Sequence, residues 1–105
     1  MVRIGVDAMG GDFAPKVVVQ GAIEASREVG PDSRIVLFGD SAQINALLEE
    51  EGVPAGGVIE VVHASEVINM NEHPAQAFSR KPDSSVAVGF RNLREGKIDG
   101  FASAG

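Results

Sequence analysis

Four short runs of strand-forming residues alternate along this 105-residue chain with longer segments of helical periodicity. Residues 34–38 are the most constraining, because the consecutive apolar side chains Ile-Val-Leu-Phe are typical of a strand buried on both faces of a parallel sheet. The other strand-like runs cover residues 3–8, 58–63 and 98–102. Strands alternating with helices imply right-handed βαβ units. We therefore predict an α/β fold, a Rossmann-like three-layer αβα sandwich with a mostly parallel sheet.

The segments between these runs have apolar residues at helical spacing. The first begins at Pro15, a residue tolerated in a first turn, and carries its apolar stripe from Val18 to Val29. The second begins after Asp40, a good N-cap residue, and ends before Gly52. Two more helices are predicted, a short one over 74–78 and a longer one from the caps at 83–85 to Gly96.

Composition excludes several classes of function. Acidic residues outnumber basic ones 15 to 9, the opposite of the balance normal in nucleic-acid-binding proteins, so no nucleic-acid partner is expected. The absence of cysteine excludes disulfides, zinc–thiolate sites and a cysteine nucleophile. No apolar run approaches the roughly 20 residues of a membrane-spanning helix, and the N-terminus lacks the apolar core of a secretory signal. We expect a cytoplasmic protein.

Small or polar residues follow the carboxyl end of every predicted strand. In an open α/β sheet, ligands bind in a crevice at the carboxyl ends of the strands. The four sets are residues 7–12, 39–40, 63–65 and 103–105. Tight turns need the same residue types, so each set taken alone also fits a purely structural role.

The first of these loops has the strongest ligand signal. Gly10 and Gly11 allow the backbone to approach a ligand closely, and the helix that follows directs N–H groups toward an anion. It is neither a dinucleotide fingerprint nor a P-loop, so phosphate binding and a simple turn both remain open. Asp7 and Asp12 are acid/base or magnesium-ligand candidates, but the favoured interpretation is that Asp12 caps the helix and Asp7 orders the loop.

A second candidate anion site precedes the last predicted helix. Two cations, Arg80 and Lys81, stand just before the hydroxyls of Ser84 and Ser85 at a helix start. The alternative is that Asp83 or Ser84 is the N-cap and that the basic neighbours are solvated. Residues 76–98 hold five bases and two acids, whereas 24–60 hold eight acids and two bases. The basic stretch either docks an acidic partner or is the wet face of a helix.

His63 lies at the carboxyl end of the third predicted strand, on the same side of the sheet as the loops above. It is a candidate general base. A lone histidine at a strand end is more often a hydrogen-bonded structural residue, and we favour that interpretation.

The loop residues resemble a known family. Residues 4–15, I-G-V-D-A-M-G-G-D-F-A-P, closely resemble the opening of the PlsX proteins, the acyl-ACP:phosphate acyltransferases. The similarity continues in order through residues 63–70, 74–77, 80–85 and 103–105, the last being the start of the family's S-A-G-N-T-G-A stretch. The D-A-M-G-G-D motif is far more specific than a generic glycine loop. Pro82 stands where many members carry lysine, so the basic cluster is thinner here.

The resemblance implies a reaction in which inorganic phosphate attacks the thioester of acyl carrier protein (ACP). The products are an acyl-phosphate for phospholipid synthesis and free ACP. The resemblance implies no metal, no cofactor and no protein nucleophile. It also implies a homodimer in the full-length protein, with peripheral association at the inner face of the membrane as a further expectation.

The resemblance also suggests which residues form the site. Gly10, Gly11 and Asp12 are expected to line the phosphate or carbonyl end of the crevice, and Ser103 and Gly105 to face them. Lys81, Ser84 and Ser85 form a second binding set. Asp12 and His63 are the candidate catalytic groups, and no metal ligand is assigned.

Family chains are much longer than this one, and the last predicted strand runs into Gly105. We therefore expect residues 1–105 to be the N-terminal portion of one larger α/β acyltransferase domain, without an internal boundary, with an incomplete sheet and no activity alone. One alternative is a phosphotransacetylase-like or dehydrogenase-like enzyme, which would use acyl-CoA or change nicotinamide absorbance. Another is a non-catalytic scaffold that binds ACP or the membrane and releases no acyl-phosphate.

Overall fold

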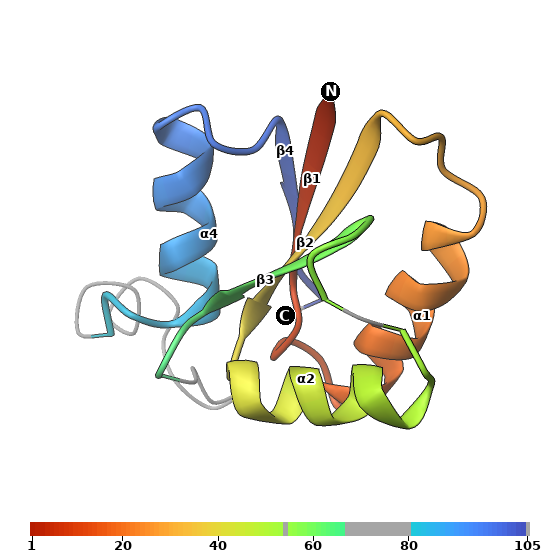
Figure 1. Ribbon diagram of the computed structural model, residues 1–105. Helices are drawn as coiled ribbons and strands as arrows, with labels where there is room; N and C mark the ends of the chain where they lie inside the picture. The colour runs from red at the N-terminus through yellow and green to blue at the C-terminus, as the bar shows by residue number, and fades with distance from the viewer. Residues whose placement is uncertain (54, 67–80, 105) are drawn as a thin grey trace.

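The computed structural model describes residues 1–53, 55–66 and 81–104, in which four parallel strands form one sheet (Figure 1). The strands are β1 (Val2–Asp7), β2 (Ser33–Gly39), β3 (Ile59–His63) and β4 (Gly100–Ala102), in the order β3-β2-β1-β4. The helices are α1 (Lys16–Ser26), α2 (Ser41–Glu50) and α4 (Ser85–Arg94). The predicted α/β class with a parallel sheet is confirmed.

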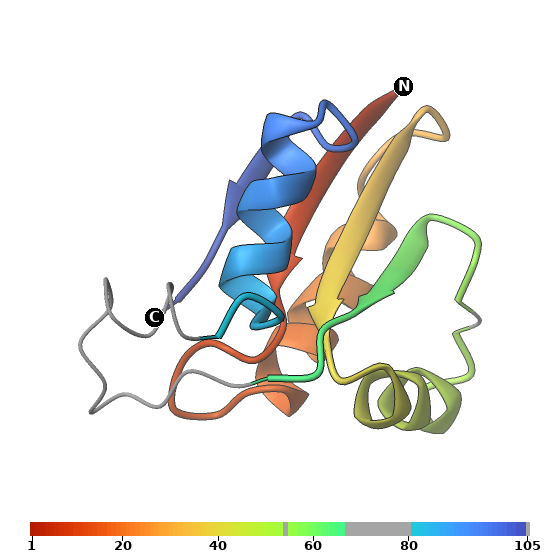
Figure 2. The same cartoon turned by 90° about the vertical axis from the view of Figure 1, so that its left-hand side faces the viewer.

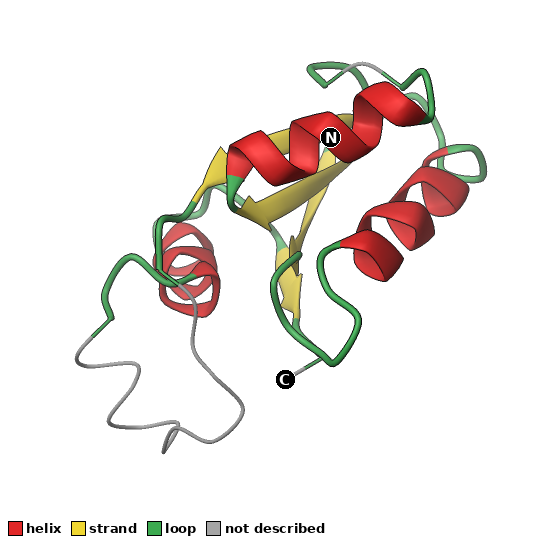
Figure 3. Ribbon diagram, turned by 90° about the horizontal axis from the view of Figure 1, so that it is seen from below, coloured by secondary structure: helices red, strands yellow, loops and turns green. Residues whose placement is uncertain are grey.

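The sheet lies between two helical layers. Figure 3 shows α1 and α2 on one side of the strands and α4 on the other, and Figure 2 shows α4 lying along the sheet. Adjacent β2 residues serve the two faces, because successive strand side chains point in opposite directions. Leu37 packs in the cluster with α1 and α2, Phe38 packs in the cluster with α4, and both are fully buried. The strand predicted to be buried on both faces is therefore confirmed.

The direction in which successive strands are added to the sheet reverses at β1. The connections from β1 to β2 and then to β3 run toward one edge, whereas β4 pairs with the other side of β1. This reversal places α4 on the opposite face from α1 and α2, as crossovers of a single hand require. The carboxyl ends of β1 and β4 therefore flank a topological switch point, the usual place for a ligand crevice in open α/β sheets.

Some predicted boundaries differ from the structure. Helix α1 ends at Ser26 rather than Val29, because the last apolar position of its stripe, Val29, is exposed and gains little from helical packing. Strand β4 begins only at Gly100; the preceding Ile98 is buried without being part of the strand. Strand β3 begins at Ile59, one residue late. The short helix predicted over 74–78 lies outside the described residues.

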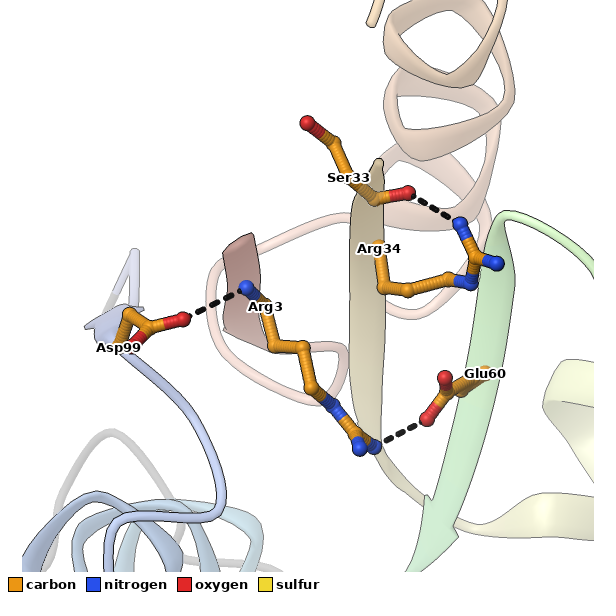
Figure 4. Close-up of polar contacts among 5 residues, drawn as sticks. All are labelled: Arg3, Ser33, Arg34, Glu60 and Asp99. Atoms are coloured by element: carbon orange, nitrogen blue, oxygen red, sulfur yellow. Dashed lines mark hydrogen bonds and ion pairs between the residues drawn. The ribbon is translucent and has the colours of Figure 1, made fainter. Parts of the chain in front are cut away.

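Polar contacts at the amino end of the sheet join strands to one another (Figure 4). The guanidinium of Arg3 donates to the Glu60 carboxylate across β2, and the Arg3 backbone N–H donates to Asp99 Oδ2 at 2.8 Å. Arg34 Nη1 donates to the carbonyl of Ser33 at 2.8 Å. These bonds pair charged groups within the fold, but the buried Nε of Arg3 has no hydrogen-bond partner in the described part of the chain. The glycine-rich loops lie at the opposite, carboxyl end of the sheet.

Candidate functional site

Asp7 lies at the carboxyl end of β1, where its side chain is only 2% exposed. Its carboxylate accepts three hydrogen bonds from three different segments. Oδ1 accepts from the backbone N–H of Met9 at 2.9 Å and from the hydroxyl of Ser85 at 2.5 Å. Oδ2 accepts from the hydroxyl of Ser103 at 2.7 Å. One buried carboxylate thus joins the β1–α1 loop, the start of α4 and the end of β4.

Gly10 fits this cluster because it has no side chain. A Cβ added there would lie 2.6 Å from Asp7 Oδ2, closer than Cβ atoms approach other atoms, and 3.1 Å from Ser103 Oγ, which is a tight contact. Gly11 has φ +94°, a conformation that favours glycine, and a Cβ there would lie 3.4 Å from Ala104 Cβ. The glycine loop after β1 therefore lies directly against residues 103–104 after β4.

Asp12 does not cap α1. The N-cap residue is Pro15, and no side chain accepts a hydrogen bond from the first turn. The favoured interpretation of Asp12 as a cap is therefore wrong; the two residues between it and Pro15 displace its carboxylate from the cap position. Asp12 is exposed, and within the described part of the chain its carboxylate makes no hydrogen bond or ion pair. The prediction that Asp7 orders the loop is confirmed by its bond to Met9.

The second predicted set divides into two roles. Ser84 is the N-cap of α4: it is fully buried, and its hydroxyl accepts from the Ala87 N–H at 3.2 Å. The capping alternative is thus confirmed for Ser84. Ser85 instead reaches Asp7 and joins the switch-point cluster. Lys81 precedes this turn, and its carbonyl accepts from the Ser84 N–H at 3.1 Å.

Asp83 ties this turn to the loop after β3. Its Oδ2 accepts from the Ser65 N–H at 2.9 Å and from the Ser65 hydroxyl. These bonds from Ser65 hold the pKa of the Asp83 carboxyl below its usual value. In return, the Asp83 N–H donates to Glu66 Oε1 at 3.0 Å. The start of α4 is therefore anchored from two sides, by Asp7 and by the β3 loop.

His63 lies at the carboxyl end of β3, which is the edge strand farthest from β4. Its Nδ1 accepts from the Ser41 N–H at 3.1 Å and lies 3.0 Å from the Ser41 hydroxyl, at the start of α2. Two strand spacings separate β3 from β1, or about 10 Å. The hydrogen-bonded structural interpretation of His63 thus agrees with its contacts, and a catalytic role stays a prediction.

Comparison with known proteins shows the family of this chain. The family described as "Fatty acid synthesis protein" matches residues 2–105. The phosphate acyltransferase of Herpetosiphon aurantiacus is 49% identical over 104 residues, covering 99% of this chain and 27% of that protein. Those of Desulforamulus reducens and Nitratidesulfovibrio vulgaris are 44% and 48% identical, covering 100% and 97% of this chain. This chain belongs to the PlsX family. It spans 27–30% of the length of these relatives.

In this PlsX chain, the described residues of the first predicted site lie together. Gly10, Gly11 and Ser103 meet at the switch point, and exposed Asp12 follows in the same loop. Gly105 lies outside the described residues. Sequence reasoning did not find that Ser85 and Ser103 share Asp7 as a partner. The available signal was Asp7 itself, an acidic residue at the end of a buried strand. Asp7 and Gly5 are two positions apart, so both lie on the face of β1 that α4 covers.

Among the described residues, no three histidine, cysteine or acidic side chains are grouped as a metal site would require. In that same part of the chain, no helix is long and apolar enough to cross a membrane.

On α4, Arg91 and Arg94 are exposed and line a shallow hollow with Phe90. Both interpretations of this basic stretch, partner docking and a solvated face, stay predictions.

Proposed function

We propose that this chain carries the phosphate-binding part of an acyltransferase that moves a fatty acyl group from acyl-ACP to inorganic phosphate. Membership of the PlsX family and the printed names of the relatives support the reaction class. The observation that carries the proposal is the meeting of the Gly10–Gly11 loop with Ser103 at the switch point. A crevice at that position is where an α/β sheet binds an anion.

The proposed chemistry needs no covalent enzyme intermediate. A phosphate oxygen attacks the thioester carbonyl carbon, the C–S bond breaks, and the thiolate of the carrier leaves as the acyl-phosphate forms. Phosphate must be held close to that carbon, and the developing oxyanion needs N–H donors. Gly11 is partly exposed, so its backbone can approach a ligand without an intervening side chain, whereas Gly10 is buried against Asp7 and holds the loop in place. Asp12, whose carboxylate lacks a partner among the described residues, is the proposed acceptor of the phosphate proton.

The other predicted residues take less direct roles. Ser103 lies against the loop at the end of β4, and Ser85 is linked to it through Asp7. Gly105 is proposed to line the same crevice on the family resemblance alone. Lys81 supplies positive charge near the start of α4, and Ser84 supports that start as its cap. His63 is a second candidate acid/base group, although its Nδ1 is already bonded at Ser41.

Larger-scale proposals rest on the family. Residues 1–105 form the N-terminal part of one larger α/β domain, since the relatives match over only 27–30% of their length. The whole protein is a cytoplasmic homodimer that uses acyl-ACP and phosphate as substrates. It feeds phospholipid synthesis, with peripheral association at the membrane.

The test is phosphate-dependent loss of acyl-ACP by the intact gene product, with the acyl-phosphate trapped by hydroxylamine. Acyl-hydroxamate that forms only with phosphate supports the proposal. Turnover of acyl-CoA with phosphate, or a nicotinamide absorbance change, would favour a related enzyme instead. A folded protein that binds ACP but yields no hydroxamate would support a scaffold.

A further inference from the structure

His63 begins a short segment, residues 63–66, that joins β3 to α2 and to the start of α4. At one end of the segment, His63 Nδ1 accepts from the Ser41 N–H of α2 at 3.1 Å. At the other end, the Ser65 N–H donates to Asp83 Oδ2 at 2.9 Å, just before α4. We propose that His63 is a positioning residue: only its neutral form completes this link, and its protonation weakens anion binding at the proposed phosphate site.

The Ser41 backbone fixes where the His63 ring carries its proton. A backbone N–H can only donate, so Nδ1 must offer its lone pair, and the neutral ring carries its proton on Nε2. Nδ1 therefore takes no proton from a substrate while this bond persists. A protonated Nδ1 can still donate to the Ser41 hydroxyl, 3.0 Å away, but the backbone N–H then loses its acceptor. The first N–H groups of a helix have no partner within the helix, so α2 is released from β3.

The other end of the segment leads to the glycine loop through two carboxylates. Ser65 donates to Asp83 through both its N–H and its hydroxyl, and Ser85, two residues after Asp83, donates to Asp7. Asp7 also accepts from the Met9 N–H in the loop after β1. A shift of residues 63–66 therefore moves the start of α4 and, through Asp7, the loop. This last step rests on the proposed function, because it assumes that the anion binds at that loop.

Two carboxylates lie near the His63 ring, one on each element that the segment joins. The pKa of the Asp40 carboxyl, the N-cap of α2, is lowered mainly by hydrogen bonds from its own helix and in smaller part by His63. The pKa of the Asp83 carboxyl is lowered mainly by hydrogen bonds from residue 65, and in smaller part by Arg91 and His63. On β2, the register partner of His63 is Gly39, which carries no charge. Both carboxylates attract a protonated ring, so protonation replaces a directed bond to α2 with attraction from two sides.

Two amide variants of His63 in the intact gene product test the assignment. In Asn, as in His, the δ1 atom is bonded to Cγ, so His63→Asn keeps an acceptor for the Ser41 N–H and removes the titration. His63→Gln carries its amide one bond further out, near the position of Nε2, and loses this acceptor. His63→Gln should raise the phosphate KM about fivefold with little change in kcat, and His63→Asn should restore KM toward the wild-type value. An acid/base role for His63 would instead lower kcat by about 10²–10⁴-fold in both variants.

Ser41 provides a matched pair of variants on the donor side. Ser41→Pro removes the N–H at the first position of α2, where proline is well tolerated, and the preceding Asp40 has the extended conformation that proline favours, with φ −66° and ψ 107°. It should raise the phosphate KM as His63→Gln does, and the double variant should have no larger effect than either single one. Ser41→Ala removes only the hydroxyl and should leave KM unchanged near neutral pH. If His63→Gln does not fold, the two Ser41 variants decide the matter.

The pH profile of KM separates this positioning role from a purely structural one. Between about pH 8 and pH 5, protonation of His63 should raise the wild-type phosphate KM toward that of His63→Gln, whereas His63→Asn has no ring to titrate. Subtracting one profile from the other removes the titration of phosphate itself. Identical profiles would overturn the inference, and so would a KM in His63→Asn as high as in His63→Gln.

Amide hydrogen exchange and calorimetry keep this inference separable from the proposed function. The Ser41 N–H should be protected in the wild-type protein and in His63→Asn, and unprotected in His63→Gln. If no hydroxamate forms, the acyl transfer is refuted, and calorimetric titration with inorganic phosphate replaces KM. Weaker phosphate binding by His63→Gln than by His63→Asn would then support the role of His63, and equal binding would overturn it. Hydroxamate formation with a Ser41 N–H equally protected in both variants would support the acyl transfer and refute that role.

Discussion

At the scale of single residues, Gly11 is where conformation and proposed function coincide. We predict that Gly11→Val abolishes phosphate-dependent turnover in the intact gene product while the protein stays folded. The reason is that φ +94° disfavours any L side chain, most of all a β-branched one, so the loop beside Ala104 must change its backbone conformation. The measurement is kcat/KM for phosphate together with the thermal unfolding midpoint.

Gly56 offers a matched control for this prediction. Its φ is +96°, nearly that of Gly11, but a Cβ there would meet nothing within 4 Å, and it lies in the loop before β3. Gly56→Val should therefore lower stability by a similar amount, about 1–2 kcal/mol, and leave turnover intact. Wild-type turnover in Gly11→Val, or equal loss in both variants, would remove the loop from the site.

Asp83 should make stability depend on pH at the acidic end. Its pKa is lowered chiefly by the Ser65 hydroxyl and backbone N–H, so its contribution is complete above the usual value of 3.8 and is lost as the pH falls through the lowered folded value. We predict that the gap in unfolding midpoint between the wild-type protein and Asp83→Asn shrinks at acid pH. Ser65→Ala, which removes the principal donor, should show a smaller dependence, and a gap independent of pH would contradict the assignment.

At the scale of elements, two helical glycines predict opposite effects of one substitution. Gly21 lies within α1 with nothing near its absent Cβ, so Gly21→Ala should raise stability by about 0.5–1 kcal/mol through helix propensity. Gly89 lies within α4, where a Cβ would be 2.2 Å from Phe101 Cε1. Gly89→Ala should lower stability because α4 must move away from β4. Thermal unfolding of both variants tests this, and the same sign in both would refute the packing of α4 on β4.

The elements were largely predictable because their signals are local. The apolar run in β2, the Asp40 cap of α2 and the Ser84 cap of α4 each depend on residues within a few positions. The end of α1 was not predictable from its stripe, because spacing alone does not show that Val29 remains exposed. The Asp7 cluster was beyond local patterns, since its hydroxyl partners lie 78 and 96 residues away. Its position at the strand ends could be predicted, but its hydrogen bonds required the order of the strands.

At the scale of the whole molecule, the two faces of the sheet contribute differently to stability and to the geometry of the proposed site. The face covered by α1 and α2 is packed with aliphatic side chains and contains no member of the Asp7 cluster. The face covered by α4 carries Phe38, Phe101 and the start of α4, which positions Ser85. Stability therefore depends on both layers, whereas the geometry of the proposed site depends mainly on one.

Replacing the two adjacent residues of β2 separates these contributions. Leu37→Ala and Phe38→Ala should each lower stability by about 3–4 kcal/mol, because both side chains are fully buried on opposite faces. Only Phe38→Ala should also raise the phosphate KM, by several-fold. Phe38 packs edge-on against Phe101, with ring centroids 5.7 Å apart, and its ring would lie 2.7 Å from a Cβ at Gly5, two residues before Asp7.

The comparison is made below the unfolding temperature of both variants, so that loss of folded protein lowers the amount of active enzyme without changing KM. A KM raised only by Phe38→Ala would mean that the α4 layer transmits packing to the crevice. A KM raised equally by Leu37→Ala would mean that the site responds to the stability of the sheet as a whole, and the division between the faces would fail.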